Sequence, residues 1–260
     1  MKSRPNDRFG INDYMMKRNV LLFGLLSFVG LFVGSCTNED DLQPLIQEGD
    51  HDYFTIGVGK QVAFAPGNLA EDGRSFVEHQ WESGGLFGWG TGNNPSLTST
   101  DWQDYPTFYD WGDSIEGGWR TLTKDEWNWV LFGRTDAYYK CTRGTVNGVH
   151  GLVLLPGKWT LPEGCTFTPS SIGYDKNIYS PSQWQQMEAA GAVFIPSTGY
   201  REDSIVYNNG GDGGSYWTST PAPWSKGGAY FWAFSSDILT SGGFNHSYIG
   251  RAVRLVRDVE

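Results

Sequence analysis

Apolar and polar positions alternate with a period of two only in short stretches of the chain. Residues 53–58 and 61–65 show this alternation on either side of Gly59 and Lys60, which predicts a pair of strands. Further strands are predicted from apolar runs at 151–156 and 192–196, each closed by proline, and at 215–219, 229–235 and 251–256. The pattern therefore indicates several short strands.

Two helix starts have the spacing of a capping box. The sequence "TKDE" at 123–126 predicts a helix that Gly133 ends, and "SPSQ" at 180–183, with proline at the first helical position, predicts a second that Gly191 ends. The inner faces of these two helices are predicted to consist of Trp127, Val130, Leu131, Trp184 and Met187.

The rest of the chain is rich in residues that form loops. Residues 70–118 are mostly Gly, Trp, Asp, Ser and Tyr, which predicts a long ordered loop region pinned by tryptophans. Two short helices, several short strands and long loops predict an α+β domain and not a doubly wound sheet. We expect one such domain over residues 53–260.

The N-terminus has the features of a targeting segment. Lys17 and Arg18 precede an apolar run at 20–33, and Gly34 and Ser35 then stand directly before Cys36. This order resembles a bacterial lipobox, in which the cysteine is lipidated, so residues 1–35 are interpreted as a lipoprotein signal peptide. The alternative is a transmembrane anchor with an incidental cysteine, although the run is short for a membrane span.

An acidic stretch follows Cys36. Glu39, Asp40 and Asp41 resemble the surface-export signal of Bacteroidetes lipoproteins, and residues 36–52 are interpreted as a lipidated tether; the alternative is a solvated linker that happens to be acidic. From Cys36 onward the chain has 14 basic and 27 acidic residues, a net charge of −13. This charge argues against nucleic acid and anionic lipid surfaces as partners, so membrane contact is expected through the lipid alone.

The remaining chemistry of the chain is sparse. Cys141 and Cys165 predict either one disulfide or two buried thiols. The histidines lack zinc-ligand spacing, so no metal site is expected, although a structural calcium in the oxygen-rich loops 101–116 or 208–214 stays open and no other cofactor is expected. A carboxylate pair for glycoside cleavage is conceivable among acidic residues in one loop, where the alternative is turn formation. These acidic residues are Asp101, Asp104, Asp110, Asp113 and Glu116.

Between Tyr216 and Val256, aromatic residues with polar tips stand among small polar residues, a composition typical of recognition surfaces. The interval 221–249 is therefore predicted to bind a ligand. Tyr230, Trp232 and Phe234 have an alternative interpretation, since they could alternate inward as core. The candidate contact residues are Trp224, Lys226, Tyr230, Asp237, Phe244, Asn245, His246 and Tyr248.

Several strings together resemble a group of Bacteroidetes surface lipoproteins related to the Fibrobacter succinogenes major paralogous domain group. They are "VAFAPGNL" at 62–69, "EHQW" at 78–81, "LFGWGTG" at 86–92, "WRTLTKDEWNWVL" at 119–131, "GTVNGVHGLVLLP" at 144–156, "YSPSQWQQMEAAGAVFIPSTGYR" at 179–201, "YWTST" at 216–220 and "GRAVRLVRD" at 250–258. The resemblance implies a C-type-lectin-like fold of the formylglycine-generating (sulfatase-modifying-factor) branch. It also implies a likeness to the variable proteins of diversity-generating retroelements, in which the segment matching 221–249 faces the ligand. Residues interpreted as structural are Trp119, Trp127, Trp184, Arg251 and Arg254.

The chain departs from the relatives in two respects. Formylglycine-generating enzymes use a late cysteine pair, and here no cysteine follows Cys165, so that activity is not expected. Lectins that bind sugar through calcium resemble one another in Glu-Pro-Asn or Gln-Pro-Asp and Trp-Asn-Asp triplets, which are absent. The expected function is that of a surface-anchored adhesin or receptor for a glycan or protein at the outer membrane. The alternatives are an assembly component of a surface complex, such as a fimbrial tip, and a polysaccharide hydrolase.

Overall fold

Strands from the two ends of the described chain share one sheet. The computed structural model describes residues 53–92, 107–223 and 227–259, all of which belong to one unit, 44–260. The first sheet has the order β1-β2-β13-β3, and all of its neighbours are antiparallel. Its strands are β1 (Phe54–Gly57), β2 (Lys60–Phe64), β3 (Trp119–Thr121) and β13 (Leu255–Val259).

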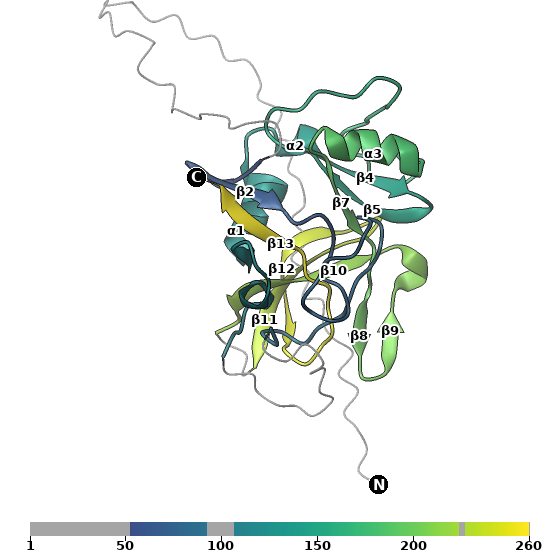
Figure 1. The fold of residues 1–260 in the computed structure, drawn as a ribbon. Helices are drawn as coiled ribbons and strands as arrows, with labels where there is room; N and C mark the ends of the chain where they lie inside the picture. The colour runs from purple at the N-terminus through teal and green to yellow at the C-terminus, as the bar shows by residue number, and fades with distance from the viewer. Residues whose placement is uncertain (1–52, 93–106, 224–226, 260) are drawn as a thin grey trace, which may run out of the picture. The chain divides into compact units, whose positions relative to one another are not determined.

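A second sheet, of order β6-β4-β5-β7, forms the middle of the chain (Figure 1). It is mixed, because β4 pairs parallel with β6 and antiparallel with β5. Its strands are β4 (Cys141–Val146), β5 (Val149–Leu154), β6 (Ile178–Tyr179) and β7 (Val193–Pro196). The helices of the described chain are short: α1 (Lys124–Asn128), the π-helical turn η3 (Trp129–Gly133), α2 (Ala137–Lys140), α3 (Pro181–Ala189), and the 3₁₀ turns η2 (Trp111–Ser114) and η4 (Asn209–Gly211).

The third sheet is an antiparallel meander, β10-β11-β12, and a two-stranded hairpin, β8-β9, lies before it in the chain. Both sheets are built from local pairing, because each strand pairs with the next one in sequence. Their strands are β8 (Tyr200–Glu202), β9 (Ile205–Tyr207), β10 (Gly214–Pro221), β11 (Gly228–Phe234) and β12 (Leu239–His246).

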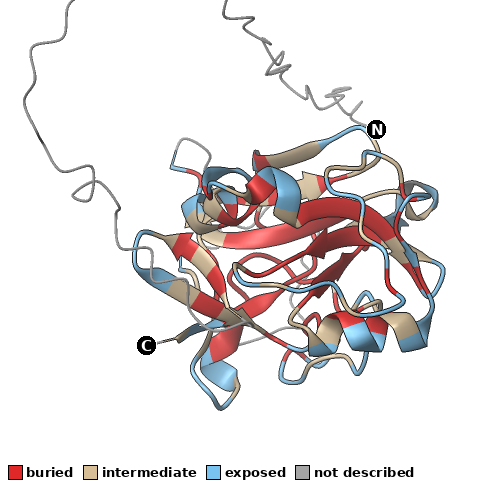
Figure 2. Ribbon diagram, turned by 90° about the horizontal axis from the view of Figure 1, so that it is seen from above, coloured by how far each residue is buried: buried red, intermediate tan, exposed pale blue. Residues whose placement is uncertain are grey.

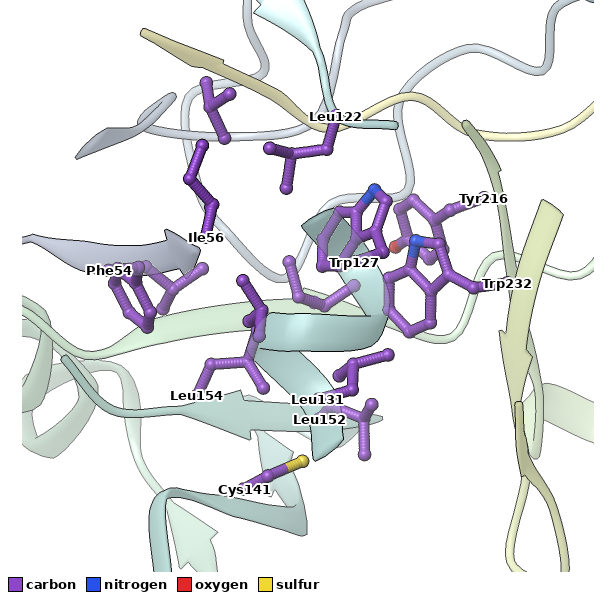
Figure 3. Close-up of a cluster of buried hydrophobic side chains, with 14 of the residues drawn as sticks. Phe54, Ile56, Leu122, Trp127, Leu131, Cys141, Leu152, Leu154, Tyr216 and Trp232 are labelled. Atoms are coloured by element: carbon purple, nitrogen blue, oxygen red, sulfur yellow. The ribbon is translucent and has the colours of Figure 1, made fainter. Parts of the chain in front are cut away.

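The largest part of the core lies where α1 meets all three main sheets. Figure 3 shows Trp127 of α1 beside Tyr216 and Trp232, with Leu152 and Leu154 of β5 on its other side. The Trp127 and Trp232 ring centroids are 4.5 Å apart. Figure 2 shows the same arrangement as burial, with long strands buried over much of their length and exposed residues in the loops and on the outer sides of the helices. Burial of such large aromatic surfaces is the main stabilising contribution in a fold with little helix.

The fold confirms the α+β class predicted from the pattern: small antiparallel or mixed sheets with a few short helices. Both predicted capping boxes are present. The Thr123 side chain accepts from the Glu126 amide, and Ser180 does the same with Gln183. The predicted inner-face residues of both helices are buried, and the 70–92 and 107–118 segments contain no strand, as expected for loops.

Two predictions in the C-terminal region were wrong. Arg251 and Ala252 form only isolated bridges, residues 253–254 form none, and the last strand begins at Leu255, because the backbone of residues 251–253 bonds to β10 and to the loops around Leu69 and Phe87. The second error is β12 (Leu239–His246), a strand in an interval between 235 and 251 for which no strand was predicted. Its Gly- and Ser-rich residues have little strand preference, and pairing with β11 supplies the hydrogen bonds instead.

Candidate functional site

The strands that enclose the predicted recognition segment belong to the core. Tyr216 and Trp217 in β10 and Trp232 and Phe234 in β11 are all buried. Trp232 stacks on Tyr216 with ring centroids 4.9 Å apart and planes 17° apart. Trp232 and Phe234 are therefore core residues, which confirms the alternative interpretation given to them from the sequence. Neither residue is available to a ligand.

Tyr230 and Phe244 come together near one end of this sheet. They are direct partners across β11 and β12, so their side chains share a face. Tyr230 is 8% exposed, whereas Phe244 is 51% exposed. The Lys124 ammonium lies 4.8 Å from the centre of the Tyr230 ring. The half-exposed Phe244 ring thus lies beside the Tyr230 phenol, and the Lys124 ammonium lies over the Tyr230 ring.

The position of Lys124 follows from how α1 is attached to the sheet. The backbone amide of Lys124 donates to the hydroxyl of Thr220 in β10, at 3.0 Å. At the other end of α1, Asn128 Oδ1 accepts from the hydroxyl of Ser241 in β12, at 2.9 Å. The sequence identified this helix start but gave no indication that Lys124 contributes to the site, because the contacts connect residues about 100 positions apart. A lysine directly after a capping residue is a common sequence pattern, so this pattern could not have pointed to a role for Lys124 in the site.

A second aromatic pair lies just beyond β12. The His246 and Tyr248 rings stack with centroids 5.2 Å apart and planes 16° apart. Tyr248 is buried, and burial, followed by the charge of Glu202, raises its pKa. Asn245 is partly exposed and its Oδ1 accepts from the His246 backbone amide at 2.8 Å. Tyr248 thus fixes the imidazole from one side, while His246 and Asn245 remain partly accessible.

Asp237 does not join these residues. It lies in the turn between β11 and β12, at the opposite end of both strands from Tyr230 and Phe244. Its backbone amide donates to the Ser235 hydroxyl at 3.2 Å, which is turn geometry. The structure therefore separates Asp237 from the other predicted contact residues. Trp224 and Lys226 lie outside the described residues, as does Cys36.

The predicted carboxylate cluster divides in a similar way. Asp110 has a structural role: its carboxylate accepts from the amides of Gly112 and Thr121 and from the Thr121 hydroxyl, at 2.8 to 3.1 Å. It thereby connects η2 to β3. Asp113 and Glu116 are exposed on or just after η2, and Asp101 and Asp104 lie outside the described residues. Turn formation is the role that the geometry gives to Asp110.

Cys141 and Cys165 are two free, buried thiols, which is one of the two arrangements that the sequence left open. They are not joined because they belong to different core clusters, Cys141 beside Leu152 and Cys165 beside Trp184. Over the ranges that the structure describes, no three His, Cys, Asp or Glu side chains lie close enough to hold a metal ion. Within those ranges, no helix has the length and apolar character needed to cross a membrane.

Arg251 and Arg254 are interior residues, as their structural interpretation requires. The Arg251 guanidinium lies 3.5 Å from the centre of the Phe231 ring and donates to the Ser215 hydroxyl. Its pKa is lowered to about 9 by burial. Arg251 thus connects the face of the β10-β11-β12 sheet opposite Tyr230 to the loop that follows Tyr248.

Comparisons with models of known protein families, with curated proteins and with solved structures found no match for this chain.

Proposed function

We propose that this protein is a ligand-recognition protein, an adhesin or receptor, that binds a glycan or a partner protein through the 221–249 segment. The observation that carries the proposal is the half-exposed Phe244 ring, held beside Tyr230 and Lys124 at the end of a sheet whose other aromatics are buried. An exposed ring on a rigid support loses little conformational entropy on binding, and a neighbouring cation and hydroxyl supply directed polar contacts.

The wider setting of this function is also a proposal. The motifs at 119–131, 179–201 and 250–258 support a C-type-lectin-like fold of the formylglycine-generating branch, and pairing of β13 with β2 and β3 is compatible with such a fold. The lipobox-like "GSC" before the acidic "TNEDD" supports a lipid anchor on Cys36 and exposure at the outer membrane. Because no cysteine follows Cys165, we do not propose a formylglycine-generating activity.

Binding of the purified protein to a fixed panel tests the proposal: mucin, xylan, pectin, fibronectin and collagen coated on separate surfaces. Phe244→Ala is expected to weaken binding at least tenfold to whichever of these materials the unaltered protein binds. Phe132→Ala is the matched control, since Phe132 is a phenylalanine of similar exposure (46%) elsewhere on the molecule, in η3. Binding that survives Phe244→Ala unchanged, or that falls equally with Phe132→Ala, would contradict the proposal.

A second candidate function is that of an assembly component in a surface complex. It is favoured by β9, where Ile205, Val206 and Tyr207 are all exposed in one short strand. Consecutive exposed apolar residues on a strand are unusual for a monomer and suit a protein interface. Crosslinking on native membranes followed by size-exclusion chromatography separates the candidates. If the unaltered protein forms a stable assembly and Val206→Lys disrupts it, the result favours this role. If the protein is a monomer and binds one of the coated materials, the result excludes this role.

A further inference from the structure

Arg254 is held inside the core by the backbone on both sides of it. The neighbouring carbonyl oxygens, of Val253 and Leu255, accept hydrogen bonds from backbone amides of the 65–69 loop at 3.0 and 2.9 Å. Arg254 itself is 1% exposed. The Arg254 guanidinium therefore cannot reach solvent unless residues 253–255 separate from the 65–69 loop.

No protein acceptor satisfies this guanidinium. Within the described residues, Nε, Nη1 and Nη2 all lack a hydrogen-bond partner. The other buried arginines have acceptors: Arg134 and Arg143 each donate to two backbone carbonyl oxygens, and Arg251 donates to a serine hydroxyl and lies over an aromatic ring. Buried polar groups are normally paired, so a guanidinium with three unpartnered nitrogens indicates a missing acceptor.

The guanidinium also keeps its charge. Burial lowers the pKa of Arg254 to about 10, against the opposing effects of Tyr216 and Glu188, so it is protonated at neutral pH. The Tyr216 hydroxyl is neutral, because burial raises its pKa, and it already donates to the Pro196 carbonyl oxygen at 2.6 Å. The Glu188 carboxylate accepts from the Gln80 side chain at 2.7 Å and makes no hydrogen bond to Arg254.

Two further unpartnered donors belong to the aromatic cluster that contains Tyr216. Trp232 stacks on its ring and also packs against Trp127, and neither indole N–H has a partner. Among the described residues, Oδ1 of Asn68 is an unpartnered acceptor close to Tyr216, since the Asn68 amide nitrogen donates to the tyrosine hydroxyl at 3.1 Å. Among the residues just named, the unpartnered N–H groups of Arg254, Trp127 and Trp232 outnumber the unpartnered oxygen of Asn68, and the charge without a bonded partner is that of Arg254.

We propose that Arg254 binds a small inorganic anion, such as chloride, inside the core near Tyr216. An anion accepts hydrogen bonds from several N–H groups and also compensates the buried charge, whereas a water molecule does only the former. A buried cation without a counter-charge is strongly unfavourable, so the guanidinium supplies the binding free energy. The anion is a structural ligand of the folded chain and is independent of the recognition function proposed above.

Thermal unfolding in matched sodium salts tests this proposal, because a ligand of the folded state raises Tm by mass action. The purified protein is compared in sodium chloride and in sodium gluconate, whose anion is too large to be enclosed, at equal ionic strength. We expect chloride to raise Tm by roughly 3–5 °C for each tenfold increase above its dissociation constant. Arg254→Met should abolish the difference between the salts, while Arg257→Met, which removes an exposed arginine of β13, should retain it.

Two further measurements keep the test decisive if Arg254→Met fails to fold. Crystals of the unaltered protein grown in sodium bromide should show an anomalous peak within hydrogen-bond reach of the Arg254 guanidinium. A water or a protein carboxylate at that position overturns the proposal, as does an identical Tm in both salts. Glu188→Gln should leave the chloride response intact or strengthen it. A chloride response that appears only in Glu188→Gln, and not in the unaltered protein, would show that Glu188 is the counter-ion and that the proposal is wrong.

Discussion

Trp232 belongs to the core and Phe244 to the proposed recognition surface, so substitutions of these two residues should separate effects on stability from effects on binding. Trp232 is fully buried, between Trp127 and Tyr216. Truncating a buried tryptophan to alanine removes apolar contacts and leaves a cavity, at a cost of about 3–5 kcal/mol. For a domain of this size, each kcal/mol lowers Tm by about 2–4 °C. Trp232→Ala is therefore expected to lower Tm by roughly 6–20 °C.

The same reasoning gives a much smaller loss of stability for Phe244→Ala. Complete burial of a phenylalanine side chain is worth about 1.5–3 kcal/mol, and Phe244 is 51% exposed. Phe244→Ala should thus cost roughly 1 kcal/mol and lower Tm by about 2–4 °C. Urea unfolding followed by tryptophan fluorescence, with equal m-values for both variants, measures the free energies directly.

The outcome that refutes this reasoning is a Phe244→Ala variant as unstable as Trp232→Ala. It would mean that Phe244 is part of the core in solution and that the exposed end of the sheet is not a separate surface. If Trp232→Ala does not fold, Trp232→Phe provides the comparison, because it removes less volume and should still cost more than Phe244→Ala.

Three other predictions follow from local geometry. Burial raises the pKa of Glu126, but the hydrogen bonds from Arg120 and Thr123 and the charge of Arg120 together lower it below its ordinary 4.5. These contacts therefore stabilise the fold above that pH, and the contribution is lost as pH falls through the lowered value; Glu126→Gln should flatten the acid limb of urea-measured stability. Burial raises the pKa of Cys141 to about 11, so iodoacetamide at pH 8 should label it in mass spectra only as fast as the chain unfolds. Gly112→Ala should destabilise the fold by more than about 2 kcal/mol, because its Cβ would lie 1.9 Å from a β3 carbonyl oxygen, whereas Gly57→Ala, with nothing within 4 Å, should be nearly neutral.

The elements that could be predicted from the sequence are those specified locally. A capping box is complete within four residues, so the starts of α1 and α3 were correct. The 53–58 and 61–65 strands were also correct, since a tight turn at Gly59 connects two alternating runs. In each case the information that defines the element lies inside the element.

The elements that could not be predicted depend on partners distant in sequence. β12 reads "LTSGGFNH", in which apolar residues do not alternate, and it is a strand because β11 is beside it. Residues 251–256 look like a strand, yet only Leu255 and Val256 belong to one, because the backbone of residues 251–253 bonds to distant segments around Leu69, Phe87 and Ser215. Of the candidate site, Phe244, Asn245 and His246 remain accessible in the structure, Tyr230 and Tyr248 are largely buried, and Asp237 is remote.

Exposure rises along one face of the third sheet. Trp232 is enclosed, Tyr230 two residues earlier is nearly so, and its cross-strand partner Phe244 is open to solvent. Because α1 is attached to β10 through Thr220 and to β12 through Ser241, the same helix that places Trp127 in the core also places Lys124 over Tyr230. The stable interior therefore fixes the geometry of this end of the sheet, where the Phe244 side chain is half exposed. A surface built in this way can change its outermost residues with little loss of folding stability.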